Sequence, residues 1–251
     1  MSYEWFSKVY DRLMEEVPYD EWAKWAEKEL LASSSRPSLH LLDLGCGTGE
    51  MTLRLQQAGH QLVGVDLSAE MLTVAQEKAD MLSLSPLFLQ QNIVNLEGFS
   101  NMDGAVMMCD VLNYVTDSSE IQQLFKRVAE TLAPGGLLLF DVHTPYKIRN
   151  IFADETFAFA GDEASYIWEC TYEEPDTVTH DVTFFVQQEN GMYERWEETH
   201  VQRAYELTSL RNWLEEAGFV VVSVSSGPRG NLSEDSERAF FVARKKSGDD
   251  K

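Results

Sequence analysis

Hydrophobic positions along residues 39–142 follow two periods in turn. Short apolar runs, typical of buried strands, alternate with segments in which apolar residues recur every three or four positions, as on one face of a helix. Strands are expected at 39–44, 62–66, 86–90, 105–108 and 137–140, and helices at about 49–58, after Ser68 and after Asp117. Strands that alternate with helices favour a parallel sheet covered by helices on both faces.

Two helices are expected before the first strand. Apolar residues at i, i+4 spacing mark residues 3–17 as a helix that Pro18 stops, and Asp20 is expected to cap a second helix through Leu31. Residues 32–38 are rich in serine and contain a proline, so they are expected to form a linker.

The periodicity changes after about residue 155. Residues alternate between two faces from 166 to 172, residues 178–186 form another run typical of a strand, and the Asn190-Gly191 pair is typical of a hairpin turn. Residues 155–205 are therefore expected to form an antiparallel insertion. The α/β pattern then returns with a helix between Thr208, as its cap, and Gly218, with strands at 219–224 and 239–243, and with a loop at 225–238 that we expect to be mobile.

Composition restricts the class of protein. A chain of 251 residues with 44% hydrophobic residues is long enough for one large domain with a sizeable core. No apolar run approaches the roughly 18 residues that a membrane span needs, and residues 1–5 lack the basic and apolar regions of a secretory signal. The three cysteines are too few and too scattered for a disulfide framework or a zinc cluster. We therefore expect a cytoplasmic protein without a bound metal.

The formal net charge of −22 bears on possible partners. A surface this acidic repels phosphate backbones, which disfavours nonspecific binding to nucleic acids. The charge is expected mainly to keep the protein soluble.

The segment DLGCGTG at 43–49 follows the first strand and opens the next helix. Glycine at such a turn allows positive φ and lets a ligand approach the bare backbone. The dinucleotide fingerprint G-x-G-x-x-G is not matched, because the glycines stand at 45, 47 and 49 and Glu50 follows them. A carboxylate at this helix start would oppose a pyrophosphate, so S-adenosylmethionine (SAM), which has no phosphate, fits better. Asp66 ends the second strand, where it can accept hydrogen bonds from the ribose hydroxyls, and Asp43 can face the ammonium group.

The DLGCGTG segment, the Asp66-Leu67-Ser68 segment and the LAPGG segment at 132–136 together resemble the class I SAM-dependent methyltransferases. The resemblance covers roughly residues 39–142 and 205–243. It implies a Rossmann-like three-layer αβα sandwich in which a seven-stranded, mostly parallel sheet has the order 3-2-1-4-5-7-6, with the last strand antiparallel. It also implies a single domain over 1–251, lid helices at 1–31 and a substrate-side insertion after strand five.

In that family the glycine turn passes beneath the methionine part of the cofactor, the acid after strand two holds the ribose, and the pair after strand three contacts the adenine. The implied cofactor-binding residues are Tyr10, Asp43, Gly45, Cys46, Gly47, Asp66, Leu67, Asn92, Ile93 and Asp110. Several have simpler roles open to them: Asn92 can be an ordinary turn residue, Asp110 a solvated loop acid, and Tyr10 a packing residue on an apolar helix face.

Catalytic residues are harder to assign. Methyl transfer is an in-line displacement, so the enzyme mainly positions two reactants and excludes water, and it needs a base only when the nucleophile carries a proton. The candidates are His143, which follows strand five, and His200, Arg203 and Tyr205, which lead back from the insertion. On an extended segment Arg203 and Tyr205 share one face and His200 lies on the other, so all four cannot point into one pocket.

The remaining histidines are less promising. His60 and His180 are expected to be peripheral.

The sequence therefore predicts a methyltransferase that uses SAM to methylate a small-molecule acceptor, without involvement of a membrane. An RNA-modifying methyltransferase, a SAM-binding regulatory protein without catalysis and a nicotinamide oxidoreductase are the alternatives. The only basic residues available for an RNA rim are Lys126, Arg127, Lys147, Arg149 and Arg203. The acceptor itself, the attacked atom (N, O or C) and the choice between monomer and homodimer stay open.

Overall fold

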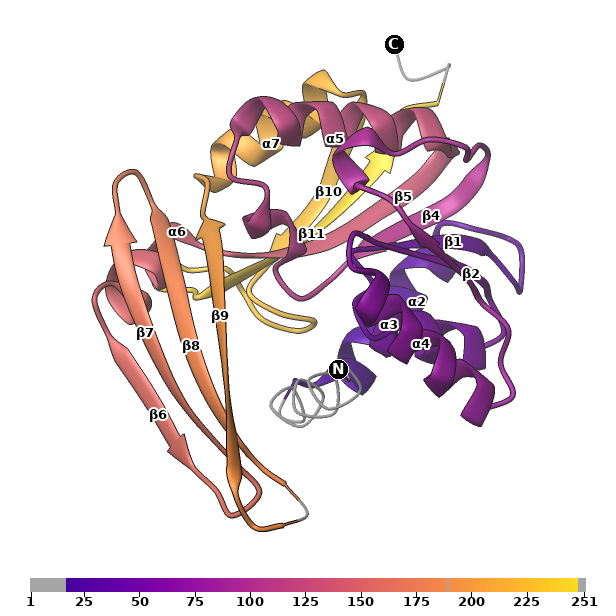
Figure 1. Ribbon diagram of the computed structural model, residues 1–251. Helices are drawn as coiled ribbons and strands as arrows, with labels where there is room; N and C mark the ends of the chain where they lie inside the picture. Colours follow the sequence, from indigo (N-terminus) through magenta and orange to yellow (C-terminus); the bar gives the residue numbers. More distant parts are fainter. Residues whose placement is uncertain (1–16, 189, 248–251) are drawn as a thin grey trace.

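A seven-stranded sheet lies at the centre of the computed structural model, which describes residues 17–188 and 190–247 (Figure 1). Its strands are β1 (His40–Leu44), β2 (Gln61–Asp66), β3 (Leu87–Gln90), β4 (Met102–Met107), β5 (Leu132–His143), β10 (Phe219–Ser225) and β11 (Arg238–Lys245). Their order is β3-β2-β1-β4-β5-β11-β10, and β11 is antiparallel to both of its neighbours. Both the predicted strand order and the single antiparallel strand are confirmed.

Helices cover both faces of this sheet. Successive strand residues point to opposite sides, so apolar residues of the strands must be buried on both faces. In β5, Leu138 and Phe140 join the core beneath two helices, α5 (Ser118–Thr131) and α7 (Leu207–Glu216). Leu137 and Leu139 join the other core, beneath α2 (Tyr19–Ala32) and α3 (Glu50–Gln57), and α4 (Ala69–Met81) lies beside α3 in Figure 1. The predicted three-layer sandwich is therefore present.

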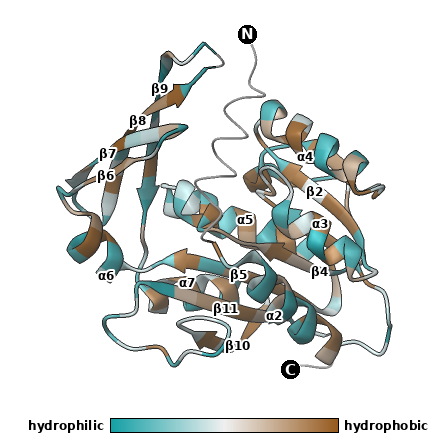
Figure 2. Cartoon of the chain, turned by 90° about the horizontal axis from the view of Figure 1, so that it is seen from below, coloured by the Kyte–Doolittle hydropathy of each residue, from teal (hydrophilic) through white to brown (hydrophobic). Residues whose placement is uncertain are grey.

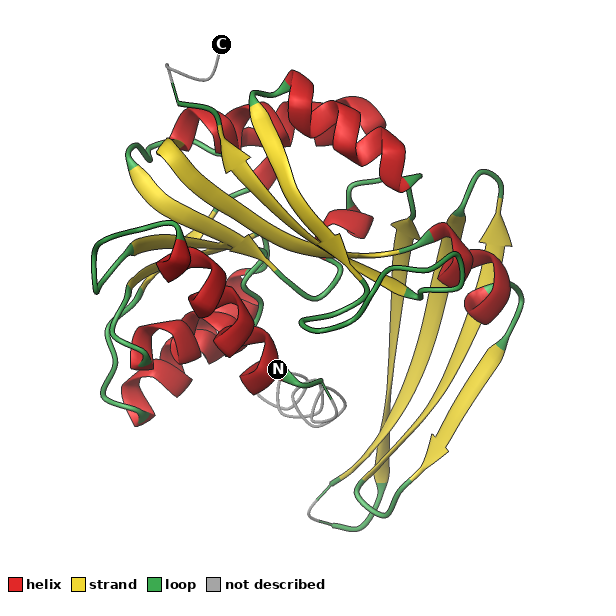
Figure 3. Cartoon of the chain, turned by 180° about the vertical axis from the view of Figure 1, so that it is seen from behind, coloured by secondary structure: helices red, strands yellow, loops and turns green. Residues whose placement is uncertain are grey.

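The insertion after strand five is a separate antiparallel sheet, seen at the lower right of Figure 3. Its strands are β6 (Thr156–Ala160), β7 (Ala164–Glu173), β8 (Thr177–Gln187) and β9 (Tyr193–Arg203), paired in that order. Two short helical segments, α6 (Pro145–Lys147) and η3 (Ile148–Phe152), connect it to β5. In Figure 2 the insertion strands carry both hydrophobic and hydrophilic residues, as the alternating pattern predicts.

Two predicted helix caps are wrong. Asp20 lies inside α2, which begins one residue earlier with Pro18 at its N-cap, because the Pro18 carbonyl accepts the Trp22 N–H at 3.0 Å. Thr208 lies inside α7, whose N-cap is Glu206. The pattern also missed β6, and it began β5 too late, since that strand starts at Leu132 and includes the Pro-Gly-Gly segment. The predicted helix at 3–17 lies almost entirely outside the described residues.

No helix within residues 17–188 and 190–247 is long and apolar enough to cross a membrane.

Candidate active site

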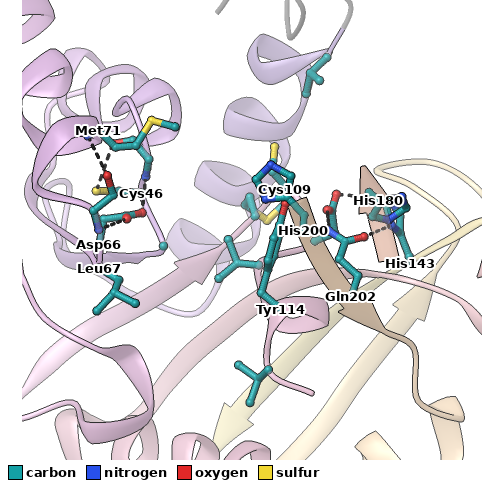
Figure 4. A pocket seen from close by; sticks show the side chains of 18 of the residues that line it. Cys46, Asp66, Leu67, Met71, Cys109, Tyr114, His143, His180, His200 and Gln202 are labelled. Atoms are coloured by element: carbon teal, nitrogen blue, oxygen red, sulfur yellow. Dashed lines mark hydrogen bonds and ion pairs between the residues drawn. The ribbon is translucent and has the colours of Figure 1, made fainter. Parts of the chain in front are cut away.

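A cavity of about 1060 Å³ lies between the carboxyl ends of the central strands and one face of the insertion (Figure 4). Its size is slightly above the range of about 300–1,000 Å³ that is usual for ligand sites. Except for Tyr10, which lies outside the described residues, every expected cofactor residue lines it: Asp43, Gly45, Cys46, Gly47, Asp66, Leu67, Asn92, Ile93 and Asp110. We call this end of the cavity, where the methyl donor is expected, the donor half. The end formed by the insertion, where the methyl acceptor is expected, is called the acceptor half.

The glycine turn joins β1 to α3 through three left-handed backbone positions. Gly45, Gly47 and Gly49 have φ values of 71°, 52° and 84°. A Cβ atom on Gly45 would lie 2.5 Å from a methyl carbon of Val111, so this position leaves no room for a side chain. A Cβ atom on Gly47 would meet nothing within 4 Å. The bare backbone at Gly47 therefore faces open space in the donor half, as expected for a turn that passes beneath a ligand.

The Asp66 carboxylate is held by two backbone N–H groups. Its Oδ2 accepts from Gly47 N at 2.8 Å, and its Oδ1 accepts from Ser68 N at 2.9 Å. Ser68 also caps α4, because its hydroxyl accepts from Met71 N at 3.2 Å. Each carboxylate oxygen can accept further hydrogen bonds, so Asp66 is fixed in place and can still bind two hydroxyl groups.

Asp43 is buried directly beneath the glycine turn. Its Oδ2 accepts a hydrogen bond of 2.6 Å from the Thr52 hydroxyl, and only 2% of the residue is exposed. Burial raises the pKa of Asp43 to about 7, although the hydrogen bonds from Thr52 act in the opposite direction. A cation that bound nearby would favour the ionised form.

Glu50 has a different setting from the one that the sequence suggested. Its carboxylate accepts from Lys78 Nζ at 2.7 Å and also pairs with Arg54. Burial acts to raise the pKa of Glu50, but these two cations outweigh it and lower that pKa. Because the charge is paired, it opposes a phosphate less than the sequence alone implies.

Asn92 forms part of a short turn at the edge of the donor half. Its Oδ1 accepts from Val94 N at 2.9 Å and begins the 3-10 helix η1 (Ile93–Asn95). Asn92 thus fills the ordinary turn role, and both Asn92 and Ile93 line the cavity.

Asp110 belongs to a buried network of charged and polar groups rather than to a solvated loop. Arg238 donates to Asp110 at 2.8 Å and also pairs with Asp141, and Gln202 donates to Asp110 at 2.7 Å. Burial opposes ionisation of Asp110, but the guanidinium and these hydrogen bonds hold the pKa of the carboxyl well below its usual range. The network joins the loop after β4 to β5, β9 and β11, so it fixes one wall of the cavity.

His143 is buried within this network and has no free basic nitrogen. His143 Nε2 lies 2.7 Å from the Arg238 guanidinium, which can only donate, and 3.3 Å from Asp110 Oδ1, so the shorter contact makes Nε2 the acceptor. The ring proton is then on Nδ1, which donates to Gln202 Oε1 over an N–O distance of 3.3 Å. Burial lowers the pKa of His143 to about 3, which keeps the ring neutral. His143 therefore positions Gln202 and Arg238.

The other catalytic candidates separate by strand face. His200 lines the cavity, whereas Arg203 and Tyr205 are absent from its lining. Arg203 donates to the Thr116 carbonyl at 3.0 Å, and the Tyr205 hydroxyl donates to the Val115 carbonyl at 2.9 Å. Both side chains thus tie the end of the insertion to the central domain.

His180 is not peripheral, contrary to expectation. It is buried, and it lines the acceptor half together with Trp168. Trp168 Nε1 donates to His180 Nδ1 at 3.0 Å, so the ring proton of His180 lies on Nε2. Burial lowers the pKa of His180 to about 4. His60, by contrast, accepts from Leu39 N at 3.2 Å and lies away from the cavity.

Comparison with known proteins identifies the family. The family model described as "Methyltransferase domain" matches residues 41–136. A protein of Geobacillus sp. (strain WCH70), named "Putative methyltransferase GWCH70_2453", is 45% identical over 247 residues, which are 98% of this chain and 100% of the relative. The chain belongs to the S-adenosylmethionine-dependent methyltransferases.

Solved structures agree with the fold of this methyltransferase. The crystal structure of a SAM-dependent methyltransferase from Clostridium acetobutylicum ATCC 824 has a TM-score of 0.90 at 28% identity, covering 98% of this chain and 99% of that one. SAM-bound CalS10, an amino pentose methyltransferase from Micromonospora echinaspora, has a TM-score of 0.73 at 16% identity, covering 95% and 97% of the two chains.

The residues of the donor half are suited to SAM. The open backbone at Gly47 leaves room for a ligand, the fixed Asp66 carboxylate can accept from hydroxyl groups, and the buried Asp43 favours a nearby cation. These features match the ribose and ammonium groups of SAM. When bound, SAM supplies a methyl group that is already activated by its positively charged sulfur.

Several cavity residues of this methyltransferase escaped the sequence analysis. Arg238 lies at the end of a loop for which the sequence predicted only mobility. Gln202 lies between the predicted candidates His200 and Arg203. Gln202 could have been predicted from the sequence, because it lies two residues after His200 and so points to the same face of the strand. Arg238 could not have been predicted in this way, since its partner Asp110 is 128 residues away along the chain.

Proposed function

We propose that this methyltransferase transfers the methyl group of SAM to a small-molecule acceptor that binds between the central sheet and the insertion. One observation carries the proposal: a single cavity continues from the glycine turn and Asp66 to the inner face of β7, β8 and β9. Donor and acceptor would then meet in one site. Positioning of this kind supplies most of what a displacement at an activated methyl group requires.

Within the donor half, we assign each group of SAM to the side chain that suits it chemically. Asp66 would accept hydrogen bonds from the ribose hydroxyls, and Asp43 would face the ammonium group. Asn92 and Ile93 would contact the adenine, and the backbone from Gly45 to Gly47 would lie beneath the methionine part. The contacts of Asp66 with Gly47 and Ser68 support its role, because they leave its outer lone pairs available.

A small acceptor agrees with the charge of the protein. The net charge of −22 disfavours a polyanionic substrate. Two of the basic residues considered for an RNA rim are paired with acids: Arg149 with Asp176 at 2.5 Å and with Glu206 at 3.2 Å, and Arg127 with Glu130 at 3.1 Å. CalS10, which has a similar fold, is an enzyme for amino pentoses, and this also favours a small acceptor.

The test is a methylation assay with radiolabelled SAM and a fractionated cell extract, which compares the wild type with Asp66→Ala. We expect label in low-molecular-weight products with the wild type only. Label in RNA would instead support an RNA-modifying enzyme. Binding of SAM without transfer to any fraction would support the regulatory alternative.

A further inference from the structure

The inner face of the insertion has a distinctive order of side chains across its strands. Alternate residues near the middle of β7, β8 and β9 line the cavity, as the pleat of a sheet requires. Register pairs Glu198 with Val182, Val182 with Trp168 and Trp168 with Phe157, so these four form one row across the sheet. The row carries a carboxylate at one edge and an aromatic surface at the other.

Aromatic rings continue on both sides of Trp168. Phe157 lies 4.9 Å from Trp168 between ring centroids, and Phe152 lies 5.4 Å from it. In the next row, Phe184 pairs with Tyr166 across the strands, and both line the cavity. A wall of this kind binds flat apolar molecules well, because aromatic faces bury a large area and stack in offset geometry.

Beside this wall lies a histidine that a carboxylate holds. His200 Nε2 lies 2.9 Å from Glu198 Oε2, and both residues are two positions apart on the same strand face. Since the carboxylate accepts the Nε2 proton, His200 Nδ1 carries the free lone pair. None of the described residues donates a hydrogen bond to that nitrogen. His143 and His180, in contrast, each have one nitrogen occupied as an acceptor by another side chain.

His200 also lies where the two halves of the cavity meet. Its ring packs edge-on against Tyr114, with 5.9 Å between centroids. Tyr114 ends the 3-10 helix η2 (Val111–Tyr114), which follows β4 and Asp110 on the donor side. In Figure 4, Tyr114 and His200 lie between the Asp66 side of the cavity and the side of His143 and His180.

We propose that the acceptor is a planar aromatic compound with an ionisable hydroxyl group, and that His200, positioned by Glu198, is the base that removes the hydroxyl proton. This inference rests on the proposed function. Trp168 and the neighbouring rings of Phe157 and Phe152 would hold the aromatic ring of the acceptor. This placement would direct the hydroxyl group of the acceptor toward His200. The enzyme would accordingly be an O-methyltransferase for aromatic compounds.

The step balances without any further reactant. The acceptor oxygen uses an electron pair to form a bond to the methyl carbon, and the carbon–sulfur bond breaks with its electron pair going to sulfur, which leaves as a neutral thioether. The hydroxyl proton passes to His200 Nδ1, and solvent later takes it from there. Glu198 touches neither reactant; it is a positioning residue that orients the ring and stabilises the imidazolium.

The test begins with a titration of S-adenosylhomocysteine, followed by methylation assays on 2-naphthol, catechol, caffeic acid and 4-nitrophenol. We expect transfer to the hydroxyl of at least one weakly acidic phenol of this panel. For that phenol, His200→Gln and Glu198→Gln should lower kcat, by about 100-fold for His200→Gln, since general-base catalysis contributes at least that much. With 4-nitrophenol, which ionises readily without help, the loss should be less than about tenfold.

Further variants separate catalysis from binding and folding. Trp168→Leu should raise KM for the aromatic probes with little change in kcat. Val201→Ala is the matched control on β9, because Val201 lies on the outer face of the insertion and is 42% exposed. It should behave like the wild type.

Each outcome bears on a distinct claim. If S-adenosylhomocysteine fails to bind, the proposed function itself is wrong. If it binds and no phenol of the panel is methylated, or only amines such as an aminosugar are, the aromatic-hydroxyl proposal is overturned. Equal losses of kcat with weakly acidic phenols and with 4-nitrophenol would overturn the role of His200 as a base. If His200→Gln does not fold, Glu198→Gln gives the same comparison.

Discussion

The position of Asp66 makes a sharp prediction for cofactor binding. Both carboxylate oxygens accept backbone N–H groups, one from Gly47 at 2.8 Å and one from Ser68 at 2.9 Å. In Asp66→Asn, one of these oxygens becomes an NH₂ group, which can only donate. Whichever way the amide turns, a donor then faces a backbone donor. The substitution therefore disturbs the site although its size is almost unchanged.

The magnitude follows from the hydrogen bonds that are lost. A hydrogen bond to a charged group contributes about 1.5–3 kcal/mol. If the ribose hydroxyls bind to this carboxylate, the loss of one such bond should weaken binding of the cofactor by about 10- to 100-fold, since each 1.4 kcal/mol is a factor of ten. Asp80→Asn is the matched control, because Asp80 is an exposed acid on α4 that does not line the cavity.

Isothermal titration with S-adenosylhomocysteine and its 2′-deoxy analogue tests the assignment directly. The wild type should bind the parent compound more tightly than the analogue, and the difference should largely disappear in Asp66→Asn. Thermal melting of each variant shows whether it is folded at the titration temperature. An unchanged Kd in folded Asp66→Asn, or an undiminished preference for the 2′-hydroxyl, would show that Asp66 does not hold the ribose.

Three further predictions concern stability. Arg238→Met leaves two buried carboxylates without their cation, and it should lower the free energy of unfolding by about 3 kcal/mol in urea titrations; a loss below about 1 kcal/mol would contradict the network. Gly45→Ala should destabilise the fold by about 1–3 kcal/mol, and adding Val111→Ala should recover part of this, because the new Cβ would lie 2.5 Å from the Val111 side chain. The pKa of Asp43 is raised from 3.8 to about 7, so the folded state holds this proton more tightly than the unfolded chain does. Its contribution to stability is complete below about pH 4 and is lost as the pH rises through about 7, so the stability of the wild type relative to Asp43→Asn should fall over that range; a constant difference between pH 4 and pH 8 would refute the shift.

The expected cofactor residues converge in the structure for a reason that is already present in the sequence. Except for Tyr10, they lie at the carboxyl ends of the first two strands or in the turns that follow the first four strands, and the carboxyl ends of neighbouring parallel strands lie at one edge of a sheet. Once the strands and their order are known, residues as distant as Asp43 and Asp110 must lie near one another. The predicted helix starts at Ser68 and Asp117 are confirmed, whereas the predicted caps Asp20 and Thr208 both lie inside their helices. A cap is predicted from the types of a few adjacent residues, whereas packing of the helix decides where its first turn begins.

The chain by itself determined the alternation of strands and helices, the glycine turn, the antiparallel insertion and the cofactor family. These depend on local periodicity and on residues that lie close together in sequence. Only the tertiary structure decided that Arg238 pairs with Asp110, that His143 has no free nitrogen and that His180 lines the cavity. Those facts depend on which side chains meet across distant strands, on burial and on the direction of each hydrogen bond. None of these leaves a pattern along the chain.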